Sequence, residues 1–381
     1  MNTRSRRILE RPTYRTISRA GRIAIGMEPH PDALQAWAAI AIARAWPGTR
    51  IDGIAAIRGD ASERRFWRLR LAPAAGAPAT AILVDLGPHD LPAYARILKL
   101  VPEPVAEPPW INVHRFLISI GVPVPALYDY AREHRALLVE DIGDLSLSDA
   151  ARRPGADAGD LFRLAVDELL RIHIEGTRHI DRKCIAESVN YDGRLFEWEL
   201  KEFVEICPAL ISPAANAAAI KPELAMLAAQ LDAFPRVFSH RDYHARNLFI
   251  QESKRPGAPH LRVIDFQDAL MAPAAQDLAV LMTTRDAGEI ITPAIERRLL
   301  DFYWTSLERR HAGALSMNDF IASYRLCVLQ HALKVTGRFE AFERAGKTGY
   351  REYIPHAIAQ ARRMLVALDR EFPILRVAMG A

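Results

Sequence analysis

The sequence of 381 residues predicts an α+β protein with two lobes. Short apolar stretches with strand character, separated by turns, dominate residues 27–140. Helical periodicity dominates residues 141–381, apart from one β-rich interruption at 235–266. A run of strands followed by a run of helices is typical of an α+β fold rather than of alternating βα units. We therefore expect an N-terminal sheet lobe and a mainly helical C-terminal lobe.

The N-terminal lobe is expected to contain five antiparallel strands with one inserted helix. A further helix begins the lobe, because Pro31 suits a first helical turn and Pro47-Gly48 ends the apolar pattern. The predicted helices cover 31–46 and 110–120. The predicted strands cover 51–58, 65–71, 81–86, 126–130 and 135–140.

The C-terminal lobe is expected to hold long helices around a small β element. The predicted helices cover 160–175, 192–206, 221–232, 294–310, 318–337 and 351–370. In the β element, the apolar runs RVFSH and NLFI precede a loop at 251–260, and LRVIDF follows. The runs RVFSH and NLFI also flank a polar segment, which they are expected to anchor in a hairpin.

The positive charge of the chain is concentrated at its N-terminus. The net charge is +4, but residues 1–22 hold seven arginines and one acid, Glu10, so the remainder carries −2. This balance gives no reason to expect nucleic-acid binding. Residues 1–26 are predicted to be a basic disordered tail. A targeting peptide and a stretch upstream of a true start at Met27 are the alternatives.

Cysteine usage and hydropathy limit the class of protein. The three cysteines are far apart and form no CxxC or Cys/His cluster, so neither a zinc site nor a disulfide framework is expected. No apolar run reaches the length of a membrane span. We expect a cytoplasmic protein, monomeric and without a membrane partner.

The segment from Ser239 to Leu248 carries the strongest chemical signal. It reads SHRDYHARNL, and an aspartate, Asp265, follows at the end of the next apolar run. The pattern HRDxxxxN with a later aspartate forms the catalytic loop and metal site of protein-kinase-like phosphotransferases. Asp242 would orient an acceptor hydroxyl and take its proton. Asn247 and Asp265 would offer oxygen ligands to magnesium. The alternative treats these residues as turn formers, but it must explain several coincidences of type and spacing.

Two further segments have the positions of nucleotide-binding elements. The turn 58–64 joins the first two strands, where a kinase-like fold covers the phosphates, although it also suits a plain polar hairpin. The segment LVEDIG, which leaves the fifth strand, suits the hinge that binds adenine or an ordinary strand exit. No Walker motif is present. The candidate nucleotide-binding residues are Gly59, Asp60, Ser62, Arg64, Glu140 and Ile142.

The remaining candidates support the loop or face the acceptor. His240 and Arg241 are expected to brace the catalytic loop, and Asp277 to cap a helix and bond back to that loop. Asp268, Trp198 and Arg338 are candidate acceptor-binding residues, and Glu199 and Lys334 lie on the same two predicted helices as the last two. Core packing is the alternative for the helical positions.

The chain resembles the aminoglycoside phosphotransferase/choline kinase-like superfamily. Within it, the chain looks like the anomeric sugar kinases of cell-wall recycling. The resemblance rests on the segments GDASERRF, LVEDIG, SHRDYHARN, IDFQDA and QHALKVTGRF. It implies a bilobal protein-kinase-like fold, ATP, magnesium, and phosphorylation of the anomeric hydroxyl of N-acetylmuramate or N-acetylglucosamine in peptidoglycan recycling.

The third predicted strand departs from the wider superfamily. It reads AILVDL and lacks the lysine that protein kinases place there against the phosphates. Either Arg64, Arg65 or Arg68 substitutes, or the protein is a non-catalytic nucleotide binder of kinase fold. A kinase for an aminoglycoside, choline, homoserine or a thiosugar is the other alternative, although cationic acceptors need an acidic pocket.

Overall fold

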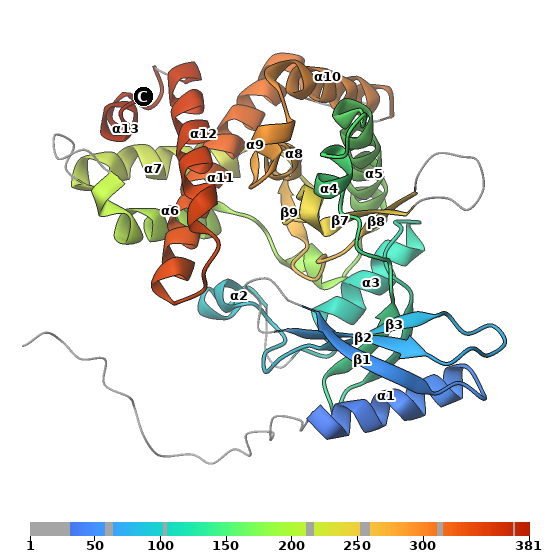
Figure 1. The fold of residues 1–381 in the computed structure, drawn as a ribbon. Coiled ribbons are helices and arrows are strands. Elements are labelled where there is room, and N and C mark those ends of the chain that lie inside the picture. Colours follow the sequence, from blue (N-terminus) through green and yellow to red (C-terminus); the bar gives the residue numbers. More distant parts are fainter. Residues whose placement is uncertain are drawn as a thin grey trace, which may run out of the picture.

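An antiparallel sheet forms the centre of the N-terminal part (Figure 1). Its strand order is β1-β2-β3-β5-β4. The computed structural model describes residues 31–57, 64–101, 105–210, 217–251, 260–310, 315–368 and 370–381. The strands are β1 (Ile51–Ile57), β2 (Arg65–Leu71), β3 (Thr80–Asp85), β4 (Leu127–Ala131) and β5 (Ala136–Glu140). All five lie where the sequence predicts them, to within one residue at each end.

The alternation of side chains along the strands gives the sheet two covered faces. Leu83 and Leu138 belong to a cluster with the apolar face of α1 (Pro31–Ala45). Their neighbours Val84, Leu137 and Val139 point the other way and join the large core shared with the C-terminal part. The sheet is therefore held between α1 and the rest of the molecule.

Among the described residues between β3 and β4 there are two helices, not one. They are α2 (Ala93–Ile97) and α3 (Pro109–Ser119), and only the second was predicted. A helix of five residues is too short to show a period in the sequence. In Figure 1, α2 lies to one side of the sheet.

Helices dominate the C-terminal part, which confirms the predicted α+β class. They are α4 (Leu147–Ala151), α5 (Ala158–His179), α6 (Gly193–Ile206), α7 (Ala217–Asp232), α8 (Ala275–Thr283), α9 (Ala287–Ile290), α10 (Pro293–Arg310), α11 (Met317–Arg344), α12 (Ile354–Ala367) and α13 (Pro373–Met379). Short 3-10 turns cover Ile185–Ser188, Pro208–Leu210, Ala245–Asn247 and Arg351–Tyr353. None of the described helices is both long and apolar enough to cross a membrane.

Two separate hairpin-like pairs replace the single predicted hairpin. β6 (Arg236–Ser239) pairs with β9 (Leu270–Pro273), and β7 (Leu248–Gln251) pairs with β8 (His260–Val263). The predicted pairing of the two runs that flank the catalytic loop is therefore wrong. The loop instead crosses from one pair to the other, so both pairs fix its ends.

Helix α11 is longer than predicted because Gly337 does not end it. A Cβ atom at Gly337 would lie 2.9 Å from Cα of Phe203, a backbone atom of α6. The glycine therefore allows two helices to approach closely, and α11 continues to Arg344. The predicted helix 351–370 is shorter in the structure, where α12 ends at Ala367.

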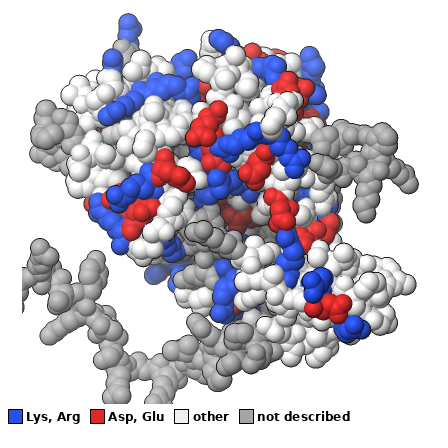
Figure 2. Space-filling model, viewed as in Figure 1, with Lys and Arg blue, Asp and Glu red and all other residues white. Residues whose placement is uncertain are grey.

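On the visible face of the described residues, Lys and Arg side chains are interspersed with Asp and Glu (Figure 2). The positively charged groups do not gather into one basic surface there. The predicted tail, residues 1–26, lies outside the described residues.

Candidate active site

The catalytic loop brings the three predicted phosphotransfer residues together. Asp242 follows β6, Asn247 directly precedes β7, and Asp265 follows β8. The amide Nδ2 of Asn247 donates to the backbone oxygen of Asp242 at 3.0 Å and to Oδ2 of Asp265 at 3.3 Å. Because Leu248 pairs with Val263, the register of β7 and β8 holds Asn247 and Asp265 side by side. The pairing of short strands thus converts distant sequence positions into one polar site.

Asp265 is already arranged to hold a cation. Its Oδ1 accepts hydrogen bonds from Nη2 of Arg64 at 2.5 Å and from Nε2 of Gln267 at 3.0 Å. Burial alone would raise the pKa of Asp265, but the charge of Arg64 and these hydrogen bonds outweigh it and lower that pKa. The residue adopts φ 65°, the left-handed region, which an aspartate tolerates better than most side chains. Asp265 is therefore ionised at neutral pH.

The oxygen atoms here fit a magnesium ion. Carboxylate and amide oxygens from Asp265 and Asn247 are the ligands that this ion takes in nucleotide sites, where phosphates and water complete its shell. Among the described residues, no group of three His, Cys, Asp or Glu side chains could hold a metal ion without such help. A nucleotide-bound magnesium ion would neutralise charge on the phosphates.

The side chain of Asp277 fixes the backbone of the catalytic loop through hydrogen bonds. This fully buried carboxylate accepts from the backbone N–H of His240 and Arg241, each at 2.8 Å, and from the hydroxyl of Ser239 at 2.9 Å. The ring of His173 lies 3.1 Å from the same carboxylate. The prediction that Asp277 caps the start of a helix is wrong, because α8 begins at Ala275 and Asp277 lies inside its first turn. Its contacts nevertheless reach the loop.

His240 ties the loop to the β7–β8 pair. Its Nε2 lies 3.0 Å from the backbone oxygen of Ile264, the residue before Asp265. The bracing residues thus join the Asp242 side of the loop to the Asp265 side. A rigid loop keeps both carboxylates at a fixed separation.

A buried charge network lies behind Asp242. Arg241 adopts φ 76°, and its Nη2 lies 3.2 Å from Oε1 of the fully buried Glu199. Lys334 Nζ lies 3.3 Å from the same oxygen, and the amide of Gln330 and the hydroxyl of Tyr191 donate to the other oxygen. Burial would raise the pKa of Glu199, but the charges of Lys334 and Arg241 lower it to about 2. Two buried cations therefore share one carboxylate beside the catalytic loop.

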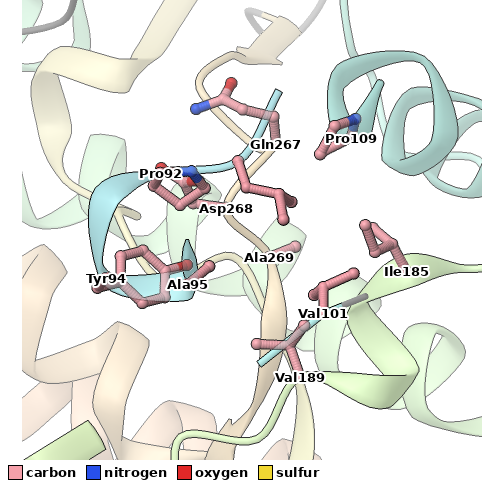
Figure 3. A pocket seen from close by; sticks show the side chains of 11 residues that line it. Pro92, Tyr94, Ala95, Val101, Pro109, Ile185, Val189, Gln267, Asp268 and Ala269 are labelled. Atoms are coloured by element: carbon pink, nitrogen blue, oxygen red, sulfur yellow. The ribbon is translucent and has the colours of Figure 1, made fainter. Parts of the chain in front are cut away.

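The same network reaches the candidate acceptor residues. Asp268 lies 4.0 Å from Nη1 of Arg241 and lines a cavity with Tyr94, Ala95 and Ala269. Figure 3 shows this cavity, in which Tyr94 and Ala95 of α2 lie near Asp268. The guanidinium of Arg241 stacks over the Tyr94 ring, 3.8 Å from its centre. The short helix α2, which the sequence did not reveal, therefore closes one side of this cavity.

Trp198 and Arg338 pair with each other. The guanidinium of Arg338 lies 5.7 Å from the centre of the Trp198 ring, and its Nη2 donates to Glu202 at 2.8 Å. They come from α6 and α11, the two helices that also supply Glu199 and Lys334. Their place next to the buried network keeps them as candidates for acceptor contact.

The three arginines near the first hairpin have different partners. Arg65 is paired with Asp85 of β3, and Arg68 is paired with Asp141 and Asp144 after β5. Arg64 alone among these three reaches the candidate metal site, through Asp265 and Gln267, which follow β8. Three of the predicted nucleotide-binding residues, Gly59, Asp60 and Ser62, lie outside the described residues.

Glu140 joins the predicted hinge to the C-terminal part. Its carboxylate accepts from the backbone N–H of Ala126 at 3.0 Å and pairs with Arg262 of β8. Ile142 follows two residues later in an irregular, half-buried segment. The side chain of Glu140 is therefore engaged in holding the sheet against β8, and its backbone N–H donates to the backbone oxygen of Ala126 at 2.9 Å.

His331 is expected to make the folded state sensitive to acid. Burial, together with the charge of Lys334, lowers its pKa to about 3 from an ordinary 6.5. Below pH 6.5, His331 is protonated in the unfolded chain but stays neutral in the folded chain. The free energy of unfolding therefore decreases as the pH falls from 6.5 towards 3. The free energy of unfolding should drop by about 2 kcal/mol between pH 7 and pH 5 through this group.

Urea denaturation of His331→Gln at both pH values checks this expectation. The variant should lose most of that drop, whereas the exposed His89→Gln should keep it. An unchanged drop in His331→Gln would contradict the assignment.

Comparison with known proteins identifies the family of this arrangement. Residues 53–312 match the family model of the phosphotransferase enzyme family. An N-acetylmuramate/N-acetylglucosamine kinase of Caulobacter vibrioides is 30% identical over 252 residues, and the match spans 65% of this chain and 65% of that protein. The kinase of the same name from Pseudomonas putida is 28% identical over 329 residues, 84% of this chain and 86% of that protein.

The fold also has relatives among solved structures. A choline kinase from Cryptosporidium parvum superposes with a TM-score of 0.55 at 12% identity, over 86% of this chain and 93% of that one. The predicted kinase-like fold and the resemblance stated from the sequence are thereby confirmed. Since the family model covers more than half of the chain and includes the whole catalytic loop, this protein belongs to the phosphotransferase enzyme family.

Proposed function

We propose that the protein transfers the γ-phosphoryl group of ATP to the anomeric hydroxyl of N-acetylmuramate or N-acetylglucosamine. We infer phosphoryl transfer from the fact that Asp242, Asn247 and Asp265 lie together in one site. The acceptor is inferred from the relatives from Caulobacter and Pseudomonas, whose names give these two sugars.

Each residue of the loop has a distinct task in this proposal. Asp242 orients the acceptor hydroxyl and accepts its proton as the oxygen–phosphorus bond forms. Asn247 and Asp265 hold the magnesium ion that accompanies ATP, and Arg64 supplies positive charge near the phosphates. The backbone at Glu140 and Ile142 binds adenine. Residues 27–140 then act as the nucleotide-binding lobe and 141–381 as the catalytic and acceptor lobe.

The charges near Asp242 do not select the acceptor by themselves. Arg241 and Lys334 together exceed the single negative charge of Glu199, but Asp268 lies 4.0 Å from Arg241, and Arg338 is paired with Glu202. The choice of a sugar acceptor therefore rests on the names of the relatives. Asp268 offers an acceptor for sugar hydroxyls, and Trp198 an apolar face for the sugar ring.

A panel of acceptors tests the proposal. ADP release would be measured with ATP and magnesium in the presence of N-acetylmuramate, N-acetylglucosamine, kanamycin, choline or homoserine. We expect release with one or both sugars only. Release of ADP with kanamycin or choline alone would mean that the acceptor is a cationic compound and not a sugar. No release with any compound, while ATP still binds, would favour the non-catalytic scaffold.

We place the reaction in the cytoplasm, where ATP is available and where the three buried free cysteines would stay reduced. We further propose a monomer. Light scattering coupled to gel filtration checks this, because a dimer would elute with twice the mass of 42.6 kDa.

A further inference from the structure

One arginine connects the two parts of the molecule at the proposed metal site. Arg64 directly precedes β2, yet its Nη2 lies 2.5 Å from Oδ1 of Asp265 and its Nη1 donates to Oε1 of Gln267 at 2.9 Å. The guanidinium is only 19% exposed. Both terminal nitrogens of the Arg64 guanidinium are therefore hydrogen-bonded to residues that follow β8.

The charges around Arg64 are those expected to surround a metal ion and phosphates. Asp265, Asp268 and Asp242 all stabilise its charged form, against the opposing effect of burial. The guanidinium thus lies among the three carboxylates of the site. Its single positive charge lies at the carboxylate where we expect a divalent cation to bind.

Both oxygens of Asp265 have partners in this arrangement. Oδ1 accepts from Arg64 and Gln267, and Oδ2 accepts from Asn247. A metal ion on this carboxylate would have to replace at least the charged partner, since two cations on one side of a carboxylate repel each other. Arg64 would then need a new anionic partner, and a phosphate matches the guanidinium fork as well as a carboxylate does.

We propose that Arg64 is a nucleotide-dependent switch that occupies Asp265 in the free protein and turns to the phosphates when ATP and metal bind together. The inference rests on the proposed function for the identity of the ligand. It explains how a chain without a lysine on β3 can still supply a cation to the phosphates. It also implies that metal and nucleotide promote each other's binding, because each removes the cost of displacing Arg64 for the other.

Binding measurements without any sugar test the switch. Mn²⁺ would be titrated into the protein without nucleotide and followed by the electron paramagnetic resonance signal of the free ion. A fluorescent, non-hydrolysable ATP analogue would be titrated separately in the presence of magnesium. The variants are Arg64→Ala and, as a matched control, Arg65→Ala, whose arginine pairs with Asp85 instead.

We expect Arg64→Ala to bind Mn²⁺ roughly tenfold more tightly and the nucleotide analogue roughly tenfold more weakly, because a partly buried ion pair is lost in the first case and a phosphate partner in the second. Arg65→Ala should match the wild type in both titrations. Unchanged Mn²⁺ affinity in Arg64→Ala would overturn the proposal, and so would unchanged affinity for the analogue.

A second substitution confirms where the metal lies. Adding Asp265→Asn to Arg64→Ala should abolish the gain in Mn²⁺ affinity, and its persistence would overturn the proposal as well. Circular dichroism verifies that each variant is folded. No sugar enters these titrations, so their outcome does not depend on whether the proposed acceptor is correct. Conversely, if the proposed switch is wrong, the wild-type protein would still phosphorylate its sugar.

Discussion

Asp242→Asn is expected to lower kcat for phosphoryl transfer by roughly 10³-fold, the size of a lost general base. The amide has the shape of the carboxylate but cannot accept the proton of the acceptor hydroxyl. The backbone oxygen of residue 242 would still bond to Asn247, and the buried Asp277 would still brace the loop. Nucleotide affinity should therefore stay within about twofold of the wild type, since the metal ligands are intact.

The control for this substitution is Asp301→Asn, an exposed position on α10. ADP release and titration of the fluorescent nucleotide would be compared for both variants. If Asp242→Asn kept more than a tenth of the activity, the base would lie elsewhere. Asp268 would then be the first alternative, because it lies 4.0 Å from Arg241, the residue that precedes Asp242.

The second large effect is expected on stability rather than on rate. Glu199→Gln should lower the free energy of unfolding at pH 7 by about 3–5 kcal/mol, because it leaves Lys334 buried without its counter-charge and Arg241 with only the more distant Asp268. The neutral amide can still accept from Tyr191 and keeps the volume of the side chain. The loss would therefore report the charge network and not a cavity.

Urea denaturation followed by circular dichroism measures this loss. Glu197→Gln is the matched control, since Glu197 lies on the same helix and is exposed, and it should change stability by less than about 0.5 kcal/mol. A loss below about 1 kcal/mol in Glu199→Gln would mean that the two cations do not depend on this carboxylate.

The acid range gives a second readout of the same network. The pKa of Glu199 is lowered to about 2 from an ordinary 4.5, so its contribution is complete above pH 4.5 and is lost as the pH falls from 4.5 to 2. The difference in stability between wild type and Glu199→Gln should shrink over that window. A difference that grows there would contradict the sign of the pKa shift.

The strands of the sheet were predictable because each one alternates. Leu83 faces α1 while Val84 faces the large core, and this period of two is visible in the sequence. The catalytic loop was predictable for another reason, since the spacing of Asp242 and Asn247 reflects one local turn. What spacing cannot show is pairing between distant segments, and so β9 and the true partners of β6 and β7 were missed.

The contacts that surround the loop depend on the tertiary structure. Arg64 and Asp265 are 201 positions apart, and nothing in either segment selects Arg64 over Arg65 or Arg68 as the cation that reaches the site. The sequence places Glu199 and Lys334 on separate helices, but their contact follows from the close approach of α6 and α11 at Gly337. The short helix α2, which presents Tyr94 to Arg241, gives no periodic signal at all.

Phosphorus and proton nuclear magnetic resonance of the reaction mixture tests the central claim most directly. The protein would be incubated with ATP, magnesium and N-acetylmuramate or N-acetylglucosamine, with Asp242→Asn in parallel. Our account predicts a new sugar phosphate signal coupled to the anomeric proton, present with the wild type and absent with the variant. A phosphate on any other hydroxyl, or no sugar phosphate from a protein that binds ATP, would contradict it.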